Sequence, residues 1–295
     1  MIETVVTTVV PFFMFTLMFG MGLSLTTSDF KRVLIFPKAT LIGLFLQLMI
    51  LPAIGFALAY TFELSAMLAV GLVAIAACPG GSTSNMVVHM GKGDTALSIT
   101  LTATATAVTL FTLPVWISYT LAFFGGADSA VEMPILRTAA QLSLFTVVPV
   151  GLGMFMRKYS PILATKEAII SKVSTLAVII AFLSAGFMEG ERILGGAGLV
   201  VIPSLLFVLA AVVLGYTIPR LSGVSKKDSS TIAVETTLKN VLLSLFLATN
   251  SLNSMEAAYS TGVLMLVMMP VAAGVMVAFN HSNREKKEIE KISVY

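Results

Sequence analysis

Long runs of hydrophobic residues, separated by short polar stretches, make up most of this chain. They lie at roughly 3–25, 36–61, 65–91, 94–124, 133–157, 168–189, 193–219, 229–252 and 255–280. Each run is long enough to cross the hydrocarbon core of a bilayer as a helix, which takes about 20 residues. Continuous runs exclude a membrane β-barrel, because barrel strands alternate apolar and polar residues. The pattern predicts an all-α polytopic membrane protein with nine transmembrane helices.

Two of these runs are interrupted halfway. Residues 77–85 read Ala-Cys-Pro-Gly-Gly-Ser-Thr-Ser-Asn, and residues 234–240 read Val-Glu-Thr-Thr-Leu-Lys-Asn. Proline lacks an amide donor and paired glycines weaken a helix, so the backbone should unwind around Pro79. In lipid, free backbone groups are tolerated only where they are buried in protein or line a wet cavity. We therefore expect two crossed, broken helices that meet near the bilayer midplane and hold a small solute and a cation.

The surroundings of the two interruptions resemble each other. Asn85 precedes Pro114 by 29 residues, and Asn240 precedes Pro270 by 30, each time through a polar turn and a hydrophobic run. Because an odd number of runs separates the two copies, they cross the membrane in opposite senses, which is typical of inverted-topology transporters. The chain thus divides into a first repeat at 1–125 with four helices, a second repeat at 133–280 with five, and a cytoplasmic tail at 281–295. We expect the tail to extend the last helix or to lie solvated at the membrane surface.

The charge balance agrees with a membrane protein and adds its orientation. The chain is 57% hydrophobic and 11% charged, whereas soluble domains are about 25% charged. The basic residues sort into loops on one side of the nine runs, with Arg192 and Arg137 the exceptions. The positive-inside rule then places the N-terminus outside and the C-terminus in the cytoplasm of a bacterial inner membrane. The lipid bilayer is the expected partner, and the net charge of +3 is no sign of nucleic-acid binding.

Two charged side chains, Glu235 and Lys239, fall deep inside a hydrophobic run. A charge at the centre of a membrane helix costs on the order of 3 kcal/mol, so such residues are candidates for a transport role. They also stand four positions apart, the favoured spacing for a structural Glu–Lys pair on one helix. Both interpretations stay open from the residues alone.

Polar oxygens accompany the carboxylate. Hydroxyl and amide groups follow the first interruption, and the next run carries two more hydroxyls one helical turn apart, at Ser98 and Thr102. Neutral oxygens with one carboxylate suit a hard monovalent cation, and the lack of a His or Cys cluster in the sequence argues against a zinc, copper or iron site. The alternative is that these hydroxyls only pack helices together. Gln47, another buried amide in a hydrophobic run, should face the protein interior.

Taken together, these residues resemble the bile acid:sodium symporter family. The resemblance covers nearly the whole chain, and its motifs are Phe19-Gly20-Met21-Gly22-Leu23, Ser28-Asp29-Phe30, Cys78-Pro79-Gly80-Gly81 with Ser84-Asn85, Ala96-Leu97-Ser98, and Glu235 with Asn240. It implies a core domain that holds the crossed helices, a panel domain that moves against the core, and a crevice for an organic anion between them. The chain begins at what looks like the second of ten helices, as nine-helix members do.

The resemblance also implies a set of site residues. A first sodium site would use Ser84, Asn85, Ser98, Thr102 and Glu235. A second, degenerate site would use Gln47, Glu235, the carbonyls near Thr236 and Leu238, and Lys239 where the family has a glutamine. A protonated lysine has no acceptor and repels sodium, so we predict that Lys239 replaces the second sodium ion. Ser82, Thr83 and Asn240 would bind the substrate, because free amides at helix N-termini attract anions.

The resulting hypothesis is a secondary active transporter that works by alternating access. Its substrate would be a small or amphipathic organic anion, such as a bile acid, an oxo acid or a pantoate-like carboxylate. We expect sodium as the coupling ion, no other metal, no cofactor and no obligate protein partner. The alternatives are a sodium- or proton-coupled antiporter and a sodium-independent carrier. An intramembrane enzyme that uses Glu235 and Lys239 as acid and base would lack an evident nucleophile, so we do not expect an enzyme.

Overall fold

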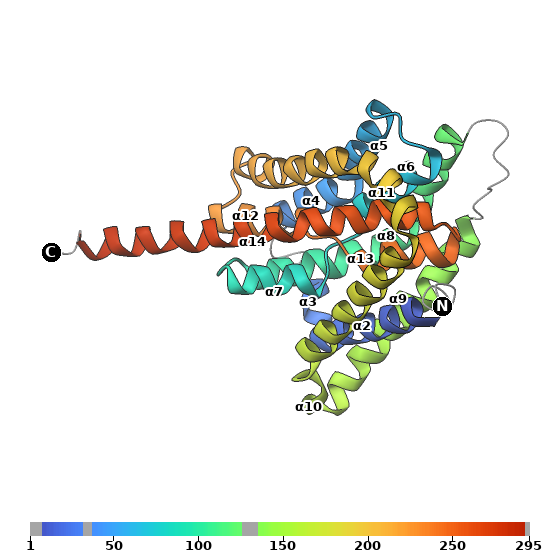
Figure 1. The fold of residues 1–295 in the computed structure, drawn as a ribbon. Coiled ribbons are helices and arrows are strands. Elements are labelled where there is room, and N and C mark those ends of the chain that lie inside the picture. Colours follow the sequence, from blue (N-terminus) through green and yellow to red (C-terminus); the bar gives the residue numbers. More distant parts are fainter. Residues whose placement is uncertain (1–7, 32–36, 126–134, 293–295) are drawn as a thin grey trace.

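The computed structural model describes residues 8–31, 37–125 and 135–292, and all regular secondary structure within those ranges is helical (Figure 1). The α-helices are α2 (Val10–Ser24), α3 (Thr27–Lys31), α4 (Pro37–Phe45), α5 (Leu51–Thr61), α6 (Ala66–Ala77), α7 (Ser82–Met90), α8 (Thr95–Phe124), α9 (Ile135–Tyr159), α10 (Pro161–Ala164), α11 (Glu167–Leu221), α12 (Lys226–Thr237), α13 (Val241–Phe246) and α14 (Met255–Ile292). Two single π-turns, η3 (Leu46–Ile50) and η4 (Leu247–Ser251), join α4 to α5 and extend α13.

The helices confirm an all-α, multi-pass membrane protein. Among the described residues, five helical stretches are long and apolar enough to cross a bilayer, and α6 with α7 makes a sixth if this pair, bent by 52°, is one span. Helix α2 and the first part of α14 are apolar but shorter. The broken pair and the stretch from Lys226 to Ser251 match the two runs that the sequence predicts to be interrupted. The total of nine spans stays a prediction.

The structure differs from expectation between residues 189 and 193, where two separate helices were predicted. A single helical element, α11, covers both runs. Figure 1 shows that α11 changes direction along its length, from its olive first part to its orange-yellow last part. The first part packs against α2, where Gly20 faces Ile170, and the last part packs against α12, where Thr236 donates a hydrogen bond to the Ala211 carbonyl at 3.1 Å. The connection from Gly190 to Gly196 contains no proline, so no amide donor is missing there and a helix can continue through it.

The tail follows one of its two predicted courses. Helix α14 continues through residue 292, and Figure 1 shows its last part projecting away from the other helices. The tail therefore extends the last helix.

The turns that precede the two broken helices have the same construction. Before α6, Glu63 has a left-handed backbone (φ 49°), and Ser65 caps the helix by accepting a hydrogen bond from the Leu68 amide. Before α12, Gly223 is left-handed (φ 80°), and Ser225 caps the helix in the same way. Both helices are 12 residues long and end in a residue with extended backbone. Matching caps, turns and lengths in two distant parts of the chain indicate one unit used twice.

These landmarks correct the register of the sequence comparison. The two capping serines are 160 positions apart, whereas the comparison paired Asn85 with Asn240 at 155 positions. In the structure Asn240 caps α13, the position that Gly81 holds before α7, while Asn85 lies one turn inside α7. The comparison failed because it aligned similar side chains, although the repeated feature is the end of a helix. Asn85 and Asn240 therefore have different local roles.

Helices α2 and α9 approach each other through glycines. A Cβ atom added at Gly22 would lie 2.2 Å from the carbonyl oxygen of Val150, and one added at Gly153 would lie 2.3 Å from that of Phe19. Close approach of this kind is how membrane helices without a hydrophobic driving force gain packing energy. The pair α2–α9 is thus a tightly fitted unit that borders the site described below.

We predict that Gly22→Ala lowers the melting temperature of the purified protein, because its new methyl group meets backbone atoms that cannot rotate away. Overpacking of this kind costs about 1–3 kcal/mol. The matched control is Gly151→Ala, since Gly151 lies in α9 with nothing within 4 Å of an added Cβ. The control should melt at the wild-type temperature or slightly above it, because alanine favours helices. Equal melting temperatures for the two variants would contradict the close packing.

Candidate functional site

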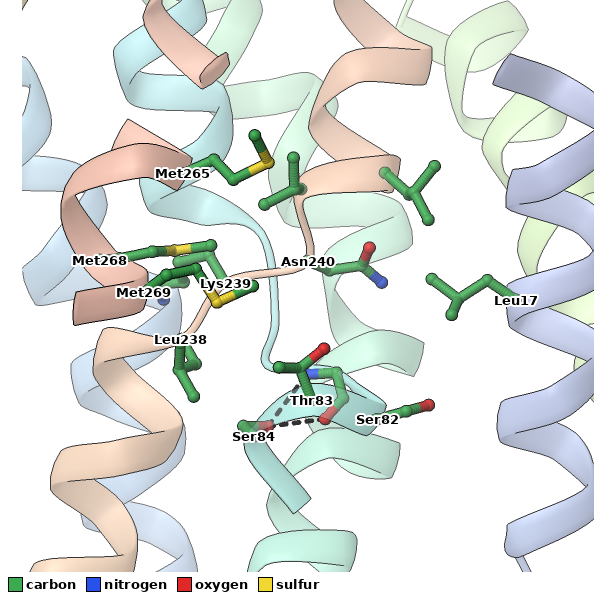
Figure 2. A pocket seen from close by; sticks show the side chains of 13 residues that line it. Leu17, Ser82, Thr83, Ser84, Leu238, Lys239, Asn240, Met265, Met268 and Met269 are labelled. Carbon is green, nitrogen blue, oxygen red and sulfur yellow. Dashed lines mark hydrogen bonds between the residues drawn. The ribbon is translucent and has the colours of Figure 1, made fainter. Parts of the chain in front are cut away.

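The two interrupted helices touch at their interruptions. Helix α6 ends at Ala77 and α7 begins at Ser82, while α12 ends at Thr237 and α13 begins at Val241. The backbone amide of Asn240, in the second interruption, donates a hydrogen bond to the Pro79 carbonyl of the first at 2.9 Å. Figure 2 shows the two extended segments passing beside each other. The crossing predicted from the sequence is present, and it is joined through the backbone.

Side chains beside each interruption satisfy the backbone groups that the helix ends leave free. The Ser84 hydroxyl accepts a hydrogen bond from the Gly81 amide at 3.1 Å and donates one to the Gly81 carbonyl at 2.7 Å. The Asn240 side-chain oxygen accepts from the Leu243 amide at 3.1 Å. Small polar residues are favoured at such helix starts for this reason. The polar residues of both interruptions thus have a structural role as well as a candidate functional one.

The Glu235 carboxylate, fully buried, lies at the centre of an oxygen cluster. The Ser98 hydroxyl donates to Glu235 and also lies 2.7 Å from the amide oxygen of Asn85. The Thr102 hydroxyl lies 2.9 Å from Glu235 and 3.2 Å from the same Asn85 oxygen. Each hydroxyl has one proton but faces two acceptors. The cluster therefore has more acceptor contacts than protons, which is the composition of a cation site.

Glycine at position 80 makes room for this carboxylate. A Cβ atom at Gly80 would lie 2.2 Å from a Glu235 carboxylate oxygen and 2.9 Å from the Ser84 hydroxyl. Ser84 is therefore next to the carboxylate, so that α7, α8 and α12 all bring oxygens to one place. The five residues predicted for a first sodium site are gathered here, although the structure does not test their role.

The residues predicted for a second, degenerate site include Gln47, which contacts the backbone of Gly80. The Gln47 side-chain oxygen, from η3, accepts a hydrogen bond from the Gly80 amide at 3.3 Å, while its amide nitrogen is buried without a partner among the described residues. The Thr236 hydroxyl donates to backbone carbonyls, including that of Ala211. Leu238 is buried at the end of α12. Gln47 and Glu235 thus flank one glycine from different helices.

The structure rules out the interpretation of Glu235 and Lys239 as a structural pair on one helix. Helix α12 ends at Thr237, so Lys239 lies outside it and the four-residue spacing no longer places the two side chains on one face. The Lys239 ammonium is buried and makes no hydrogen bond to Glu235 or to any other residue in the described part of the chain. A buried charge without a partner is costly, so this side chain calls for a functional explanation.

The predicted substrate residues Ser82, Thr83 and Asn240 line one small cavity of about 40 Å³. The hydroxyl of Ser82 and the side-chain amide nitrogen of Asn240 are buried, and neither has a partner within the described ranges. In Figure 2 both side chains point toward Leu17 of α2, whereas Lys239 points the opposite way, toward the methionines of α14. Lys239 and the α14 methionines line the same cavity, so the two neighbouring residues Lys239 and Asn240 point in opposite directions within one lining.

A larger crevice of about 720 Å³ shares Ser82 and Thr83 with this cavity. Its walls are mostly apolar, and it extends between α7 and α11 to a rim that contains His89, Glu167 and Lys172. Sequence reasoning missed the apolar lining residues, among them Ile99 and Leu176 of the crevice and Leu17 of the small cavity, because nothing in a hydrophobic run marks one residue as facing a cavity. The crevice joins a polar inner end to an apolar passage.

Comparisons with known proteins identify relatives that are named as sodium-coupled transporters. A family model described as the Sodium Bile acid symporter family matches residues 11–195. The chain is 32% identical to a probable chloroplastic sodium/metabolite cotransporter, BASS2, of Oryza sativa subsp. japonica over 253 residues, covering 83% of this chain and 58% of that one. It is 28% identical to the sodium-dependent transporter YocS of Bacillus subtilis over 260 residues (87% and 78%), and 28% identical to the human ileal sodium/bile acid cotransporter over 248 residues (82% and 69%). The chain spans 58–64% of the length of the plant relatives that it matches.

We predict that Gly80→Ala destabilises the protein, because the new methyl group would displace either the Glu235 carboxylate or the Ser84 hydroxyl. The neighbouring Gly81→Ala is the matched control, since an added Cβ there meets nothing closer than Asn240 atoms at 4.0 Å. Melting temperatures of the purified variants check this. A drop for Gly80→Ala alone is expected, and a larger drop for Gly81→Ala would contradict the described placement of Glu235.

Proposed function

We propose, from the premise that this chain belongs to the sodium bile acid symporter family, that it is a secondary active transporter which couples sodium to the movement of an organic anion. The relatives above have the names of transporters and not of enzymes. The observation that carries the proposal is the acceptor-rich oxygen cluster around Glu235, placed where two broken helices cross and beside a cavity lined by free donors. A cation and an anion thus have adjacent sites.

The coupling cation in this proposal is a single sodium ion among Ser84, Asn85, Ser98, Thr102 and Glu235. Sodium is a hard cation that prefers oxygen, and one carboxylate with neutral oxygens is the appropriate charge for a monovalent ion. Among the residues that the structure describes, no group of three His, Cys, Asp or Glu residues is arranged to hold another metal. A bound sodium ion would also supply positive charge to the Asn85 and Glu235 oxygens, which compete for the protons of Ser98 and Thr102.

Lys239 takes the place of a second sodium ion in this proposal. Its ammonium group has no hydrogen-bond partner among the described residues, and its side chain points toward the methionines of α14, with which it lines the small cavity. Gln47 and Glu235 remain as oxygen carriers, but a lysine among them contributes only donors. While the lysine is protonated, the site would hold a positive charge and would not take up an ion.

The proposed substrate is an organic anion with a carboxylate. The unpartnered donors of Ser82 and Asn240 are suited to carboxylate oxygens, and the N-terminus of α7 adds free amides and a favourable dipole. The apolar walls of the crevice accommodate the remainder of the molecule. A bile acid, an oxo acid and a pantoate-like carboxylate all fit this description, and the relatives are named for bile acids or for unspecified metabolites.

The architecture proposed from the sequence accounts for movement across the membrane. Two inverted repeats, at 1–125 and 133–280, would form a core that contains the crossing and a panel that contains α2, α9 and the first part of α11. The matching caps of α6 and α12 support the duplication. The crevice lies between α7 of the core and α11 of the panel, and its rim holds Lys172, on the side that the positive-inside rule assigns to the cytoplasm of a bacterial inner membrane. Rocking of one part against the other would give alternating access.

A sodium/proton antiporter is the second candidate, because Glu235 and Lys239 are the buried acid and base at the crossing. An antiporter of this kind would exchange ions without an organic solute. The donor-lined cavity of Ser82 and Asn240 favours the anion carrier. Sodium exchange measured in liposomes with and without added carboxylates separates the two candidates, since only the carrier requires the anion.

We predict that Thr102→Val weakens sodium binding by roughly 10-fold to 100-fold, because it removes one oxygen next to the carboxylate at little change in volume. Thr106→Val is the matched control on the same helix, since the Thr106 hydroxyl donates only to its own helix, at the Thr102 carbonyl. The measurement is the sodium concentration that half-saturates uptake of taurocholate, pyruvate or pantoate into proteoliposomes, with potassium as the ionic control.

The expected result is sodium-driven uptake by wild type and by Thr106→Val, with a much higher sodium requirement for Thr102→Val. Melting temperatures provide an independent readout, because a ligand that binds only the folded state stabilises it. Uptake that is the same in potassium and in sodium would contradict sodium coupling. An unchanged sodium requirement for Thr102→Val would contradict the assigned site.

A further inference from the structure

Lys239 is the one charged side chain of the crossing that has no hydrogen-bond partner among the described residues. In the described part of the chain, the buried charged side chains are Asp29, Glu235 and Lys239. Asp29 lies in the short helix α3 outside the expected spans and accepts hydrogen bonds from the amide and hydroxyl of Thr26. Glu235 and Lys239 are therefore the two buried charges at the crossing, one negative and one positive.

Glu235 and Lys239 make no hydrogen bond to each other, but both are buried at the crossing. Glu235 is held by the hydroxyls of Ser98 and Thr102 and does not need the lysine as a donor. Lys239, 5% exposed, lies one residue from the backbone bond that joins the two interruptions. The lysine therefore contributes its charge to the crossing whether or not a ligand is bound there.

This arrangement determines how many ions the crossing can take up. With Glu235 at −1 and Lys239 at +1, the fixed charge at the crossing is zero. A net charge in a low-dielectric interior is strongly disfavoured, so the occupied crossing is most stable when it is neutral too. A crossing that is neutral when empty stays neutral only if the bound cations and the bound anions carry equal total charge. One sodium ion then accompanies one monovalent anion.

We propose, resting on the carrier function above, that Lys239 makes transport electroneutral, with one sodium ion moved for each monovalent organic anion. Without the lysine the fixed charge would be −1, and neutrality with an anion bound would require two sodium ions. The same residue therefore sets both the ion stoichiometry and the charge of the preferred substrate. Accumulation of the substrate would then depend on the sodium gradient and not on the membrane potential.

The test is accumulation of taurocholate, pyruvate and pantoate in proteoliposomes at a fixed sodium gradient, with and without an inside-negative potassium potential set by valinomycin. A potential of about 100 mV changes the final accumulation ratio about 50-fold for each net charge moved. We expect less than a twofold change for wild type and for Lys239→Arg, which keeps the charge. Lys239→Gln should gain a dependence of about 50-fold and a sodium Hill coefficient that rises from about one toward two.

Lys166→Gln is the control for loss of a positive charge, because Lys166 is exposed at the start of α11. It should behave as wild type. Sodium-driven accumulation by wild type that rises about 50-fold with the potential would overturn electroneutrality while leaving the carrier function intact, and this comparison needs no variant to fold. No sodium-driven accumulation of any of the three probes would overturn the carrier function and this inference with it. A Lys239→Gln protein that transports without voltage dependence would show that the lysine does not set the stoichiometry.

Discussion

One constraint organises this molecule: two membrane helices stop halfway, and the backbone groups that they leave free must find partners away from water. The hydrogen bond from the Asn240 amide to the Pro79 carbonyl meets this constraint for both interruptions at once. Side chains satisfy further groups, with Ser84 bonded to Gly81 and Asn240 to Leu243. Because each interruption supplies a partner for the other, neither is stable alone. A site built on this contact is accordingly fixed in geometry by the same bonds that hold the fold.

The crossing holds hydrogen-bond acceptors and donors in separate places, in addition to satisfying free backbone groups. Acceptor oxygens of Asn85 on α7 and Glu235 on α12 gather around two hydroxyls of α8, so that two hydroxyl protons face four acceptor contacts. Donors gather at the helix ends, where Lys239, Asn240 and Ser82 each carry a buried polar atom without a partner among the described residues. An electron-rich cluster and a set of free donors lie within a few residues of each other. In the function proposed above, this division into acceptors and donors would let a cation and an anion bind side by side and favour each other electrostatically.

The sequence predicted those features that depend on local chemistry. Pro79 and its following glycines cannot continue a helix, so the first interruption followed directly from covalent structure. The oxygen cluster was also predictable in part, because Ser98 and Thr102 stand one turn apart on one face. Features set by distant contacts were not predictable. The end of α12 at Thr237 depends on Pro79, which is far away in the chain, and so the spacing of Glu235 and Lys239 suggested a helical pair that does not exist. The continuity of α11 was missed for a related reason: a glycine-containing, charged connection permits a loop but does not require one.

The position of Lys239 shows how a small backbone change alters function. If α12 continued by one more turn, Lys239 would lie over Glu235, and the two would neutralise each other as an inert pair. Because the helix ends at Thr237, the lysine points toward the α14 methionines and Asn240 points toward Leu17, and both residues line the small cavity. The flexible methionine side chains there can follow the ammonium group as it moves, at little packing cost. The interruption thus keeps both charges at the crossing without a hydrogen bond between them, and in the function proposed above the carboxylate would bind a cation while the lysine would supply a fixed positive charge.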